Sequence, residues 1–286
     1  MHTIILDTDI GSDVDDALAL ATVLGSESVN LLGITTVYGD TKLRARIAHH
    51  LCHLANRSIQ VFAGLEKPLS GREVWVSGSE GRAFSNLDQY APESKSAVDF
   101  LVEKVNQNPG QIEVIAIGPL SNIATAIMQA PNFAKNVKHL WIMGGDFTKE
   151  KIEHNFKCDV DAAKIVLESE ISITILDLPS SQKTIIKKDE IEKIKSSGKL
   201  GPTLHSEILN WIQPRQQDWT TPHDPIAVLA LLAPELFDFS ESGSVKIDES
   251  GLSEWRLNKD GNVKKTSPSH PSEAVNTMIS LIAKVV

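Results

Sequence analysis

The stretch IILDTDIGSDVDDALAL, residues 4–20, decides the fold of this chain. It begins with three apolar residues, continues through five aspartates within ten positions, and ends in apolar residues at helical spacing from Ala17 onward. This order predicts a strand, an acidic loop and a helix. The loop would follow the carboxyl end of a first strand, which is where open α/β sheets bind their ligands.

The aspartates of this loop, Asp7, Asp9, Asp13, Asp15 and Asp16, are close together in the sequence. Ionised carboxylates at such spacing repel one another and raise each other's pKa values unless a cation or protons neutralise them. Ca²⁺ and Mg²⁺ are hard cations that prefer oxygen ligands, so the loop indicates a site for one of them. The alternative is that the acids are solvated or stabilise the first helical turn, but their number and the glycine-flanked turns disfavour it.

Strand-like and helical segments alternate along the first 176 residues. Strands are predicted at residues 31–37, 59–63, 112–117, 137–143 and 171–176, and helices at 41–56, 94–106, from 118, and at 159–169. The alternation predicts an α/β fold with an open, mainly parallel, Rossmann-like sheet flanked by helices. The intervening residues 64–92 are rich in Gly, Ser and Pro, and long irregular loops of this kind tend to form lids or binding loops.

The pattern changes after residue 176. Extra C-terminal helices are predicted at 187–196, 203–213 and 226–232 and from 272, and weak alternation at 245–266 predicts a small peripheral hairpin that turns at 259–262. Because no linker, repeat or low-complexity tract interrupts the chain, residues 1–286 are expected to form one domain.

The overall charge favours a small substrate. The chain has 28 Lys and Arg against 37 Asp and Glu, a formal net charge of −9, which argues against nucleic acid and against an anionic membrane surface as partners. The two cysteines, Cys52 and Cys158, lie far apart without a CxxC context, so neither a disulfide framework nor a thiolate metal site is expected. No basic leader precedes the first strand and no apolar run approaches a membrane span, so we expect a cytoplasmic protein.

Three other protein classes place acids in such a loop. An EF-hand needs a glutamate at the twelfth position, where Leu18 stands if Asp7 is the first, so that interpretation fails. A haloacid-dehalogenase-type phosphotransferase also begins with a strand and Asp-x-Asp, but usually has Thr or Val where Gly11 stands and does not use three more carboxylates directly afterwards. A receiver-type phosphorylation module, which is a signalling protein, is far shorter than this chain.

Six motifs along the chain resemble, in the same order, those of the inosine-uridine-preferring nucleoside hydrolase family. The first is the acidic loop, and the others are TTVYGD at 35–40, GPLSN at 118–122, MGG at 143–145, EHNF with DVDAA within 153–163, and HDP at 223–225. The resemblance implies an enzyme of nucleoside salvage that hydrolyses the N-glycosidic bond of a ribonucleoside to ribose and free base.

The same resemblance implies one bound Ca²⁺ as cofactor, held by Asp9, Asp16, Asp224 and the backbone carbonyl of Ile117. Coordination would lower the pKa of a water molecule, and Asp9 beside it can accept the proton as general base. Water, rather than a side chain, is then the nucleophile. His223 matches the residue that protonates the leaving base, a role suited to a side chain that titrates near neutral pH.

Substrate contacts also follow from the resemblance. Asp15, Glu153 and Asn155 match positions that hold ribose, and an extended loop at 153–155 would point both of the latter side chains the same way. Asp40 stands where the family commonly has Asn, and it is retained as a substrate-binding residue because a ribose hydroxyl can donate a hydrogen bond to it.

Aromatic residues are candidates to stack on the nucleobase. Trp219, which closely precedes His223, and Trp75, which lies in the long loop, are the expected ones. Trp211 is at helical spacing with Ile208 and Ile212, so core packing is its expected role.

Departures from the family pattern bear on substrate choice and activity. The first loop is two residues longer, so either Asp13 or Asp15 could take the role of the family's second acid. Asp15 is favoured by its place next to Asp16, which leaves Asp13 without an assigned role, while Asp7 is expected to brace the loop. The long loop carries no histidine for the nucleobase, and Asp40, unlike Asn, cannot donate a hydrogen bond when ionised. A catalytically impaired ribonucleoside-binding protein is therefore the alternative function, and the phosphotransferase ranks third. The expected partner is a small-molecule ribonucleoside, and the expected assembly is a homodimer or homotetramer.

Overall fold

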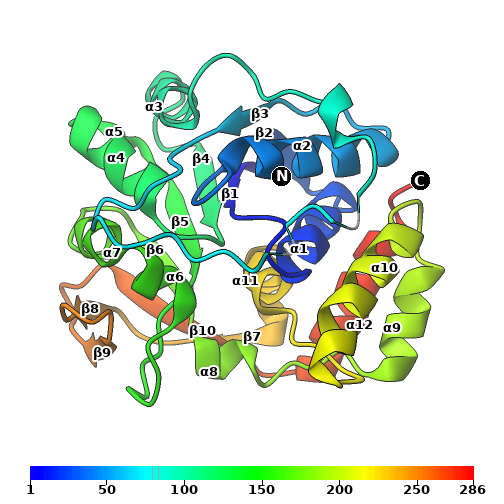
Figure 1. Cartoon of the computed structure of the whole chain (residues 1–286). Coiled ribbons are helices and arrows are strands. Elements are labelled where there is room, and N and C mark those ends of the chain that lie inside the picture. The colour runs from blue at the N-terminus through cyan, green and yellow to red at the C-terminus, as the bar shows by residue number, and fades with distance from the viewer. Residues whose placement is uncertain (79, 83) are drawn as a thin grey trace.

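A sheet of ten strands forms the centre of the fold, shown in Figure 1 as a computed structural model that describes residues 1–78, 80–82 and 84–286. The strands are β1 (His2–Thr8), β2 (Val29–Thr36), β3 (Val61–Ala63), β4 (Ile112–Ala116), β5 (His139–Met143), β6 (Ile173–Leu176), β7 (Phe237–Phe239), β8 (Gly243–Ile247), β9 (Ser253–Leu257) and β10 (Val263–Pro268). Their hydrogen-bonded order is β3-β2-β1-β4-β5-β6-β10-β8-β9, and β7 pairs with β10 beside this path.

The sheet is parallel from β3 through β10 and antiparallel beyond. β1 pairs in parallel with both β2 and β4, and β6 pairs in parallel with both β5 and β10. The pairs of β10 with β7 and β8, and of β8 with β9, are antiparallel. The predicted open, mainly parallel α/β sheet flanked by helices is therefore confirmed.

Helices cover both faces of the sheet (Figure 1). They are α1 (Asp15–Leu24), α2 (Thr41–Leu54), α3 (Ala97–Gln107), α4 (Ser121–Gln129), α5 (Phe133–Asn136), α6 (His154–Cys158), α7 (Val160–Leu167), α8 (Leu178–Ser181), α9 (Lys188–Lys195), α10 (Gly201–Ile212), α11 (His223–Leu232) and α12 (Pro271–Ala283). Among the described residues, no helix combines the length and the apolar character that crossing a membrane requires.

Strand β1 shows how the two cores form. Successive side chains of a strand point to opposite faces, and Ile4 and Leu6 accordingly belong to a core with α1, α2 and α9 to α12, whereas Ile5 belongs to a core with α3, α4 and α7. All three side chains are fully buried. A continuous apolar run buried on both faces is typical of a central parallel strand, and it places the acidic loop at the middle of the sheet's carboxyl edge.

Two local expectations are wrong. The hairpin turns at 248–252, not at 259–262, because the Asp248 carboxylate accepts hydrogen bonds from the backbone N–H groups of Ser250, Gly251 and Leu252. Residues 259–262 instead connect β9 to β10, which pairs with β6 within the main sheet. The loop expected to be extended at 153–155 instead enters a helix, since α6 begins at His154.

Candidate active site

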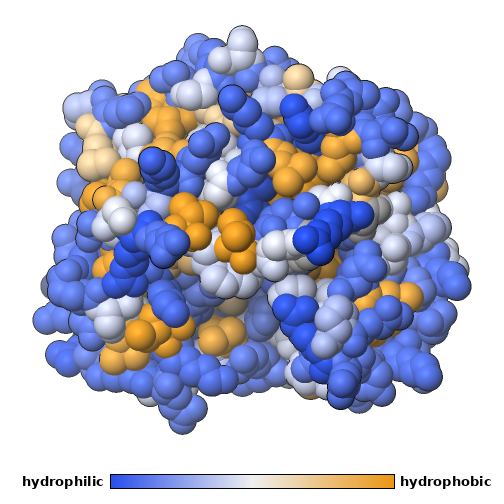
Figure 2. Space-filling view, in the orientation of Figure 1, coloured by the Kyte–Doolittle hydropathy of each residue, from blue (hydrophilic) through white to orange (hydrophobic). Residues whose placement is uncertain are grey.

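A cavity of about 350 Å³ opens at the carboxyl edge of the sheet. Its residues lie at or after the ends of β1, β3, β4, β5 and β6 or come from helices α1, α6, α8, α10 and α11. They are Asp9, Ser12, Asp13, Asp15, Asp16, Trp75, Ile117, Met143, Ile152, Glu153, His154, Asn155, Leu178, Trp211, His223 and Asp224. In the orientation of Figure 2, exposed apolar residues lie near the centre of a mainly hydrophilic face. The structure thus brings together every site residue predicted from the sequence except Asp40 and Trp219.

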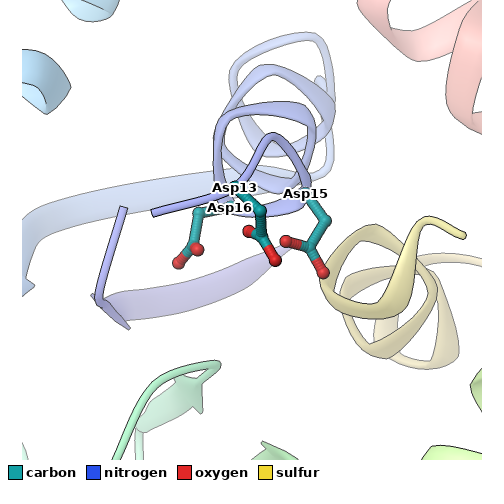
Figure 3. Close-up of side chains that lie close together, drawn as sticks. All are labelled: Asp13, Asp15 and Asp16. Atoms are coloured by element: carbon teal, nitrogen blue, oxygen red, sulfur yellow. The ribbon is translucent and has the colours of Figure 1, made fainter. Parts of the chain in front are cut away.

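The acidic loop forms one wall of this cavity. The carboxylates of Asp13, Asp15 and Asp16 offer ligand oxygens that all lie within 4.8 Å of one another, and Figure 3 shows the three side chains extending from the start of α1 in the same direction. Asp9 and Asp224 line the same cavity from the end of β1 and the first turn of α11. Asp13, which had no assigned role, therefore lies within the carboxylate cluster.

Four of these carboxylates are almost completely buried: Asp9, Asp15, Asp16 and Asp224 are 6%, 6%, 3% and 4% exposed. Within the described part of the chain, none of the four takes part in an ion pair. Burying unpaired charges is costly, so this set of oxygen donors fits a divalent cation such as Ca²⁺ or Mg²⁺.

The pKa values of the buried carboxyls reflect this crowding. Burial raises the pKa of Asp224 well above its ordinary value, and the neighbouring charges of Asp16 and Asp13 raise it further. The pKa values of Asp15 and Asp16 are likewise raised, first by burial and then by like charges. For Asp9, burial raises the pKa and the positive charge of Arg44 opposes that rise. A cation at this wall would relieve the repulsion in all four.

Asp7 braces the loop from the core side, as predicted. Its carboxylate accepts hydrogen bonds from the Thr35 hydroxyl at 2.5 Å and from the Asn122 amide at 2.7 Å. Asp7 is fully buried, and burial raises its pKa to about 7 against the effect of these two bonds. The bonds tie the end of β1 to β2 and α4.

Two neighbouring turns fit closely around the Asp9 side chain. A Cβ atom at Gly118 would lie 2.8 Å from the Asp9 carboxylate, so only glycine allows the turn after β4 to approach it. The Ile117 carbonyl, the expected cation ligand, accepts a hydrogen bond from the Asn155 amide at 3.0 Å. That amide also donates to the Met143 carbonyl at 3.1 Å, so Asn155 fixes the ends of two strands.

Glu153 and Asn155 line the cavity, but not from an extended loop. Glu153 is the N-cap of α6, where its carboxylate accepts hydrogen bonds from the backbone N–H groups of Gly145, Asn155 and Phe156 at 2.7–3.0 Å. Three donors on one carboxylate favour a helical turn at this point over the extended loop expected. A carboxylate offers about four lone-pair sites, so these bonds leave room for a further donor.

His223 begins α11, next to Asp224. The His223 side chain is half-buried, and its Nδ1 lies 2.7 Å from the Ser181 hydroxyl. Burial lowers the pKa of His223, while the negative charge of Asp13 opposes this. The ring is thus oriented by α8 and lines the same cavity as the carboxylate cluster.

Asp40 and Trp219 do not line this cavity. Asp40 is exposed and caps α2 by accepting a hydrogen bond from the Leu43 N–H at 2.9 Å. Trp219 is 40% exposed and lines a neighbouring cavity of about 280 Å³.

Among the cavity residues that sequence reasoning missed, two carry ring side chains. Trp211, expected in the core, packs against the core and also lines the cavity, with the Arg215 guanidinium 3.3 Å from the centre of its ring. His154 lies beside Trp75, with ring centres 5.1 Å apart. Helical spacing alone cannot separate a side chain that faces a core from one that faces a cavity, and nothing else in the sequence marked Trp211.

Comparisons with known proteins agree with this geometry. The model of the inosine-uridine preferring nucleoside hydrolase family matches residues 4–278. A probable uridine nucleosidase of Oryza sativa subsp. japonica is 32% identical over 94% of this chain and 85% of its own length, and one of Arabidopsis thaliana is 34% identical over 87% and 83%. The purine-preferring ribonucleoside hydrolase of Gardnerella vaginalis, 24% identical, shares the fold over 99% of this chain and 98% of its own with a TM-score of 0.88.

Proposed function

The chain belongs to the inosine-uridine preferring nucleoside hydrolase family, whose members are metal-dependent enzymes that hydrolyse ribonucleosides, and on this premise we propose how its own residues divide the reaction. The cofactor is Ca²⁺, held by Asp9, Asp16, Asp224 and the Ile117 carbonyl. The observation that carries the proposal is the set of nearly buried carboxylates without an ion pair, which lies at one wall of the cavity. When bound, the cation would lower the pKa of a water molecule and raise its nucleophilicity.

Asp9 accepts the proton from the attacking water. Asp9 directly follows β1 and lines the same cavity as Asp13, Asp15 and Asp16, and Gly118 leaves its carboxylate the space to do so. As the bond from the anomeric carbon to the base nitrogen breaks, positive charge develops on the sugar. The carboxylates that line the wall stabilise that charge, because they are already in place before the reaction.

His223 donates a proton to the departing base. Its ring is held by the Ser181 hydroxyl on one side and faces the cavity, where Asp13 favours the protonated form. Asp15, Glu153 and Asn155 hold the ribose hydroxyls. Glu153 and Asn155 are themselves fixed by backbone hydrogen bonds, so the sugar is bound by side chains that do not need to reorganise.

The nucleobase lies toward α10. A second cavity, of about 460 Å³, shares Ser12, Asp13, Trp75 and Trp211 with the first and adds Glu207 and Asn210. One carboxylate oxygen of Glu207 is buried without a hydrogen-bond partner, which suits an N–H group of a base. Since the relatives of highest identity named above are probable uridine nucleosidases, uridine is the first substrate to test, ahead of purine ribonucleosides.

Free ribose is the product to measure. We expect ribose release from uridine to be abolished by a chelator and restored by Ca²⁺, and the variant Asp9→Asn to lose activity while Asp260→Asn, at an exposed aspartate, retains it. Binding of nucleosides without ribose release from any of a purine and pyrimidine panel would instead favour a ribonucleoside-binding protein.

The expected assembly and location are part of the same proposal. A homodimer or homotetramer in the cytoplasm would suit an enzyme of nucleoside salvage. Light scattering of the purified protein measures the mass of the assembly directly, and a mass of one 31.2 kDa chain would contradict it.

A further inference from the structure

Arg44 is a buried arginine beneath the acidic loop. It lies on α2 and is 2% exposed, and it is the one lysine or arginine that is buried among those the structure describes. Its guanidinium makes four hydrogen bonds. Nε donates to the Tyr38 carbonyl at 2.6 Å, Nη1 to the carbonyls of Asp9 and Ile10, the latter at 2.9 Å, and Nη2 to the Ser12 hydroxyl at 3.0 Å.

These acceptors are backbone carbonyls and a hydroxyl, not the nearby carboxylates. A guanidinium carries its donors in a rigid fork, so it can bridge several oxygens at fixed angles. Here the fork holds the backbone of residues 9–12, which precedes the cluster formed by Asp13, Asp15 and Asp16. Arg44 therefore places a positive charge beneath the carboxylates without occupying their oxygens, one of which, on Asp16, accepts a hydrogen bond from the Thr8 hydroxyl.

The same guanidinium is also connected to the segment that carries Trp75. Tyr38 adopts a left-handed backbone conformation, with φ of 67°, and in it presents its carbonyl to Arg44. The Tyr38 hydroxyl in turn accepts a hydrogen bond from the Trp75 N–H at 2.7 Å. Arg44, through Tyr38, thus joins the acidic loop to Trp75, which lines the same cavity.

We propose that Arg44 is a positioning residue: its guanidinium fixes the backbone from Asp9 to Ser12 in the shape that lets the carboxylates share one cation, and links that loop to the segment that carries Trp75. The inference rests on the proposed function only for its effect on turnover. Its effect on cation binding is argued from the hydrogen bonds of Arg44 and needs only that the carboxylates bind a cation.

The test uses Arg44→Lys and measures Ca²⁺ binding to the chelator-treated full chain by isothermal titration calorimetry. Lysine keeps the charge but has no fork, so it cannot bridge the four acceptors. We expect Ca²⁺ to bind about 10- to 100-fold more weakly, as is usual when a residue that orients metal ligands is changed. The kcat at limiting Ca²⁺ should fall in the same proportion and recover at saturating Ca²⁺.

Arg46→Lys is the matched control, because Arg46 lies on the same helix but pairs with Asp88 at the surface. Its Ca²⁺ affinity should equal that of the wild type. A folded Arg44→Lys protein with wild-type Ca²⁺ affinity would overturn the proposal, as would a wild-type protein that binds no Ca²⁺.

Ser12→Ala decides the matter if Arg44→Lys does not fold, since it removes one acceptor of the fork and leaves the guanidinium in place. We expect it to weaken Ca²⁺ binding by about threefold, the value of one modest hydrogen bond, and unchanged binding would overturn the proposal. If the wild-type protein binds Ca²⁺ but releases ribose from no nucleoside, the proposed function fails while the comparison of Ca²⁺ affinities still stands.

Discussion

The two walls of the cavity are built on opposite principles. The acidic wall consists of β1, the start of α1 and the first turn of α11, and its carboxylates are buried and held by neighbouring backbone and side-chain groups. The wall toward α10, which we call the base wall, consists of Trp75, Glu207, Asn210 and Trp211. Its residues are half-buried or exposed, and Trp75 lies in a long irregular segment.

The difference teaches which part of the site can vary. A group that must meet developing charge has to be fixed in advance, and the acidic wall is fixed by a central strand. Side chains that only stack on a base and hydrogen-bond to its edge can lie in a less rigid part of the chain, because stacking is insensitive to small displacements. We therefore expect substitutions in the acidic wall to affect the chemical step and the cation, and those in the base wall to affect substrate affinity.

The largest effect is expected from Asp224→Asn, which removes one carboxylate of the acidic wall. Ribose release should fall by about three orders of magnitude, because a metal ion supplies several kcal/mol of charge stabilisation. In chelator the same variant should be more stable than the wild type by about 1 kcal/mol, since it removes a buried like charge. Ribose assays and urea unfolding in chelator measure the two changes.

Glu235→Gln is the control for this variant, because Glu235 is exposed and follows α11 closely. Neither its activity nor its stability should change. If Asp224→Asn is less stable than the wild type in chelator, repulsion between the carboxylates does not destabilise the acidic wall. The proposed difference between the two walls would then be wrong.

The acidic wall should also make stability depend on pH when no cation is present. Burial raises the pKa of Asp7 to about 7 from 3.8, so the folded protein holds this proton more tightly than the unfolded chain. Stability in chelator should therefore fall as the pH rises from about 4 to 7, by about 4 kcal/mol for this group alone. The raised pKa values of Asp15, Asp16 and Asp224 act in the same direction.

Urea unfolding at pH 5 and pH 8 in chelator measures this dependence. Asp7→Asn should reduce it, since asparagine can still accept the bonds from Thr35 and Asn122 but does not titrate. Added Ca²⁺ should stabilise the protein more at pH 8 than at pH 5. If stability in chelator rises from pH 5 to pH 8 instead, the raised pKa values assigned to the buried aspartates are wrong.

A smaller effect, confined to substrate affinity, is expected from Glu207→Gln in the base wall. Burial raises the pKa of Glu207 to about 7, opposed by its hydrogen bond to Asn210. If its carboxylate accepts an N–H of the base, KM should rise about tenfold in the variant with kcat unchanged. The wild-type KM should also rise as the pH falls through 7, and that of Glu207→Gln should not.

Ser206→Ala is the control, because Ser206 is exposed on the same helix. Kinetics with N3-methyluridine, which lacks the N–H, provide a second check. Wild-type enzyme and Glu207→Gln should differ much less on this substrate than on uridine. If wild-type enzyme and Glu207→Gln differ in KM equally on uridine and on N3-methyluridine, Glu207 does not bind the N–H of the base.

The acidic wall could be predicted from the sequence far better than the base wall, for a physical reason. Five aspartates behind the apolar run of Ile4 to Leu6 are neighbours in the chain, so local geometry already places them together. The helical spacing of Trp211 predicted a core residue, because a helix face toward a cavity has the same periodicity as a face toward a core. Nothing in the sequence predicted that Arg44 is buried, since the burial of a charged side chain depends on which oxygens the tertiary fold brings to it.

The fold shows the same limit. The alternation of strands and helices predicted the parallel strands through β6. The hairpin turn was misplaced because β10 does not pair with β9, the strand before it. It pairs with β6 and lies between β6 and β8. Sequence alternation predicts that a strand exists. Which strand it pairs with, when the connection is not a simple crossover, is decided by the edges that the rest of the sheet leaves open.

The smallest effect is expected from Trp219→Ala. Trp219 was predicted to stack on the base, yet it lines the neighbouring cavity of about 280 Å³, whose lining includes Trp211 and His223 but neither Glu207 nor Asn210. Removing it should change KM for uridine by less than about twofold. Trp211→Ala should raise KM about tenfold, the usual loss when one stacking aromatic is removed. If Trp219→Ala has the larger effect, the base enters the neighbouring cavity, and the base wall must be moved from Glu207 to the segment before α11.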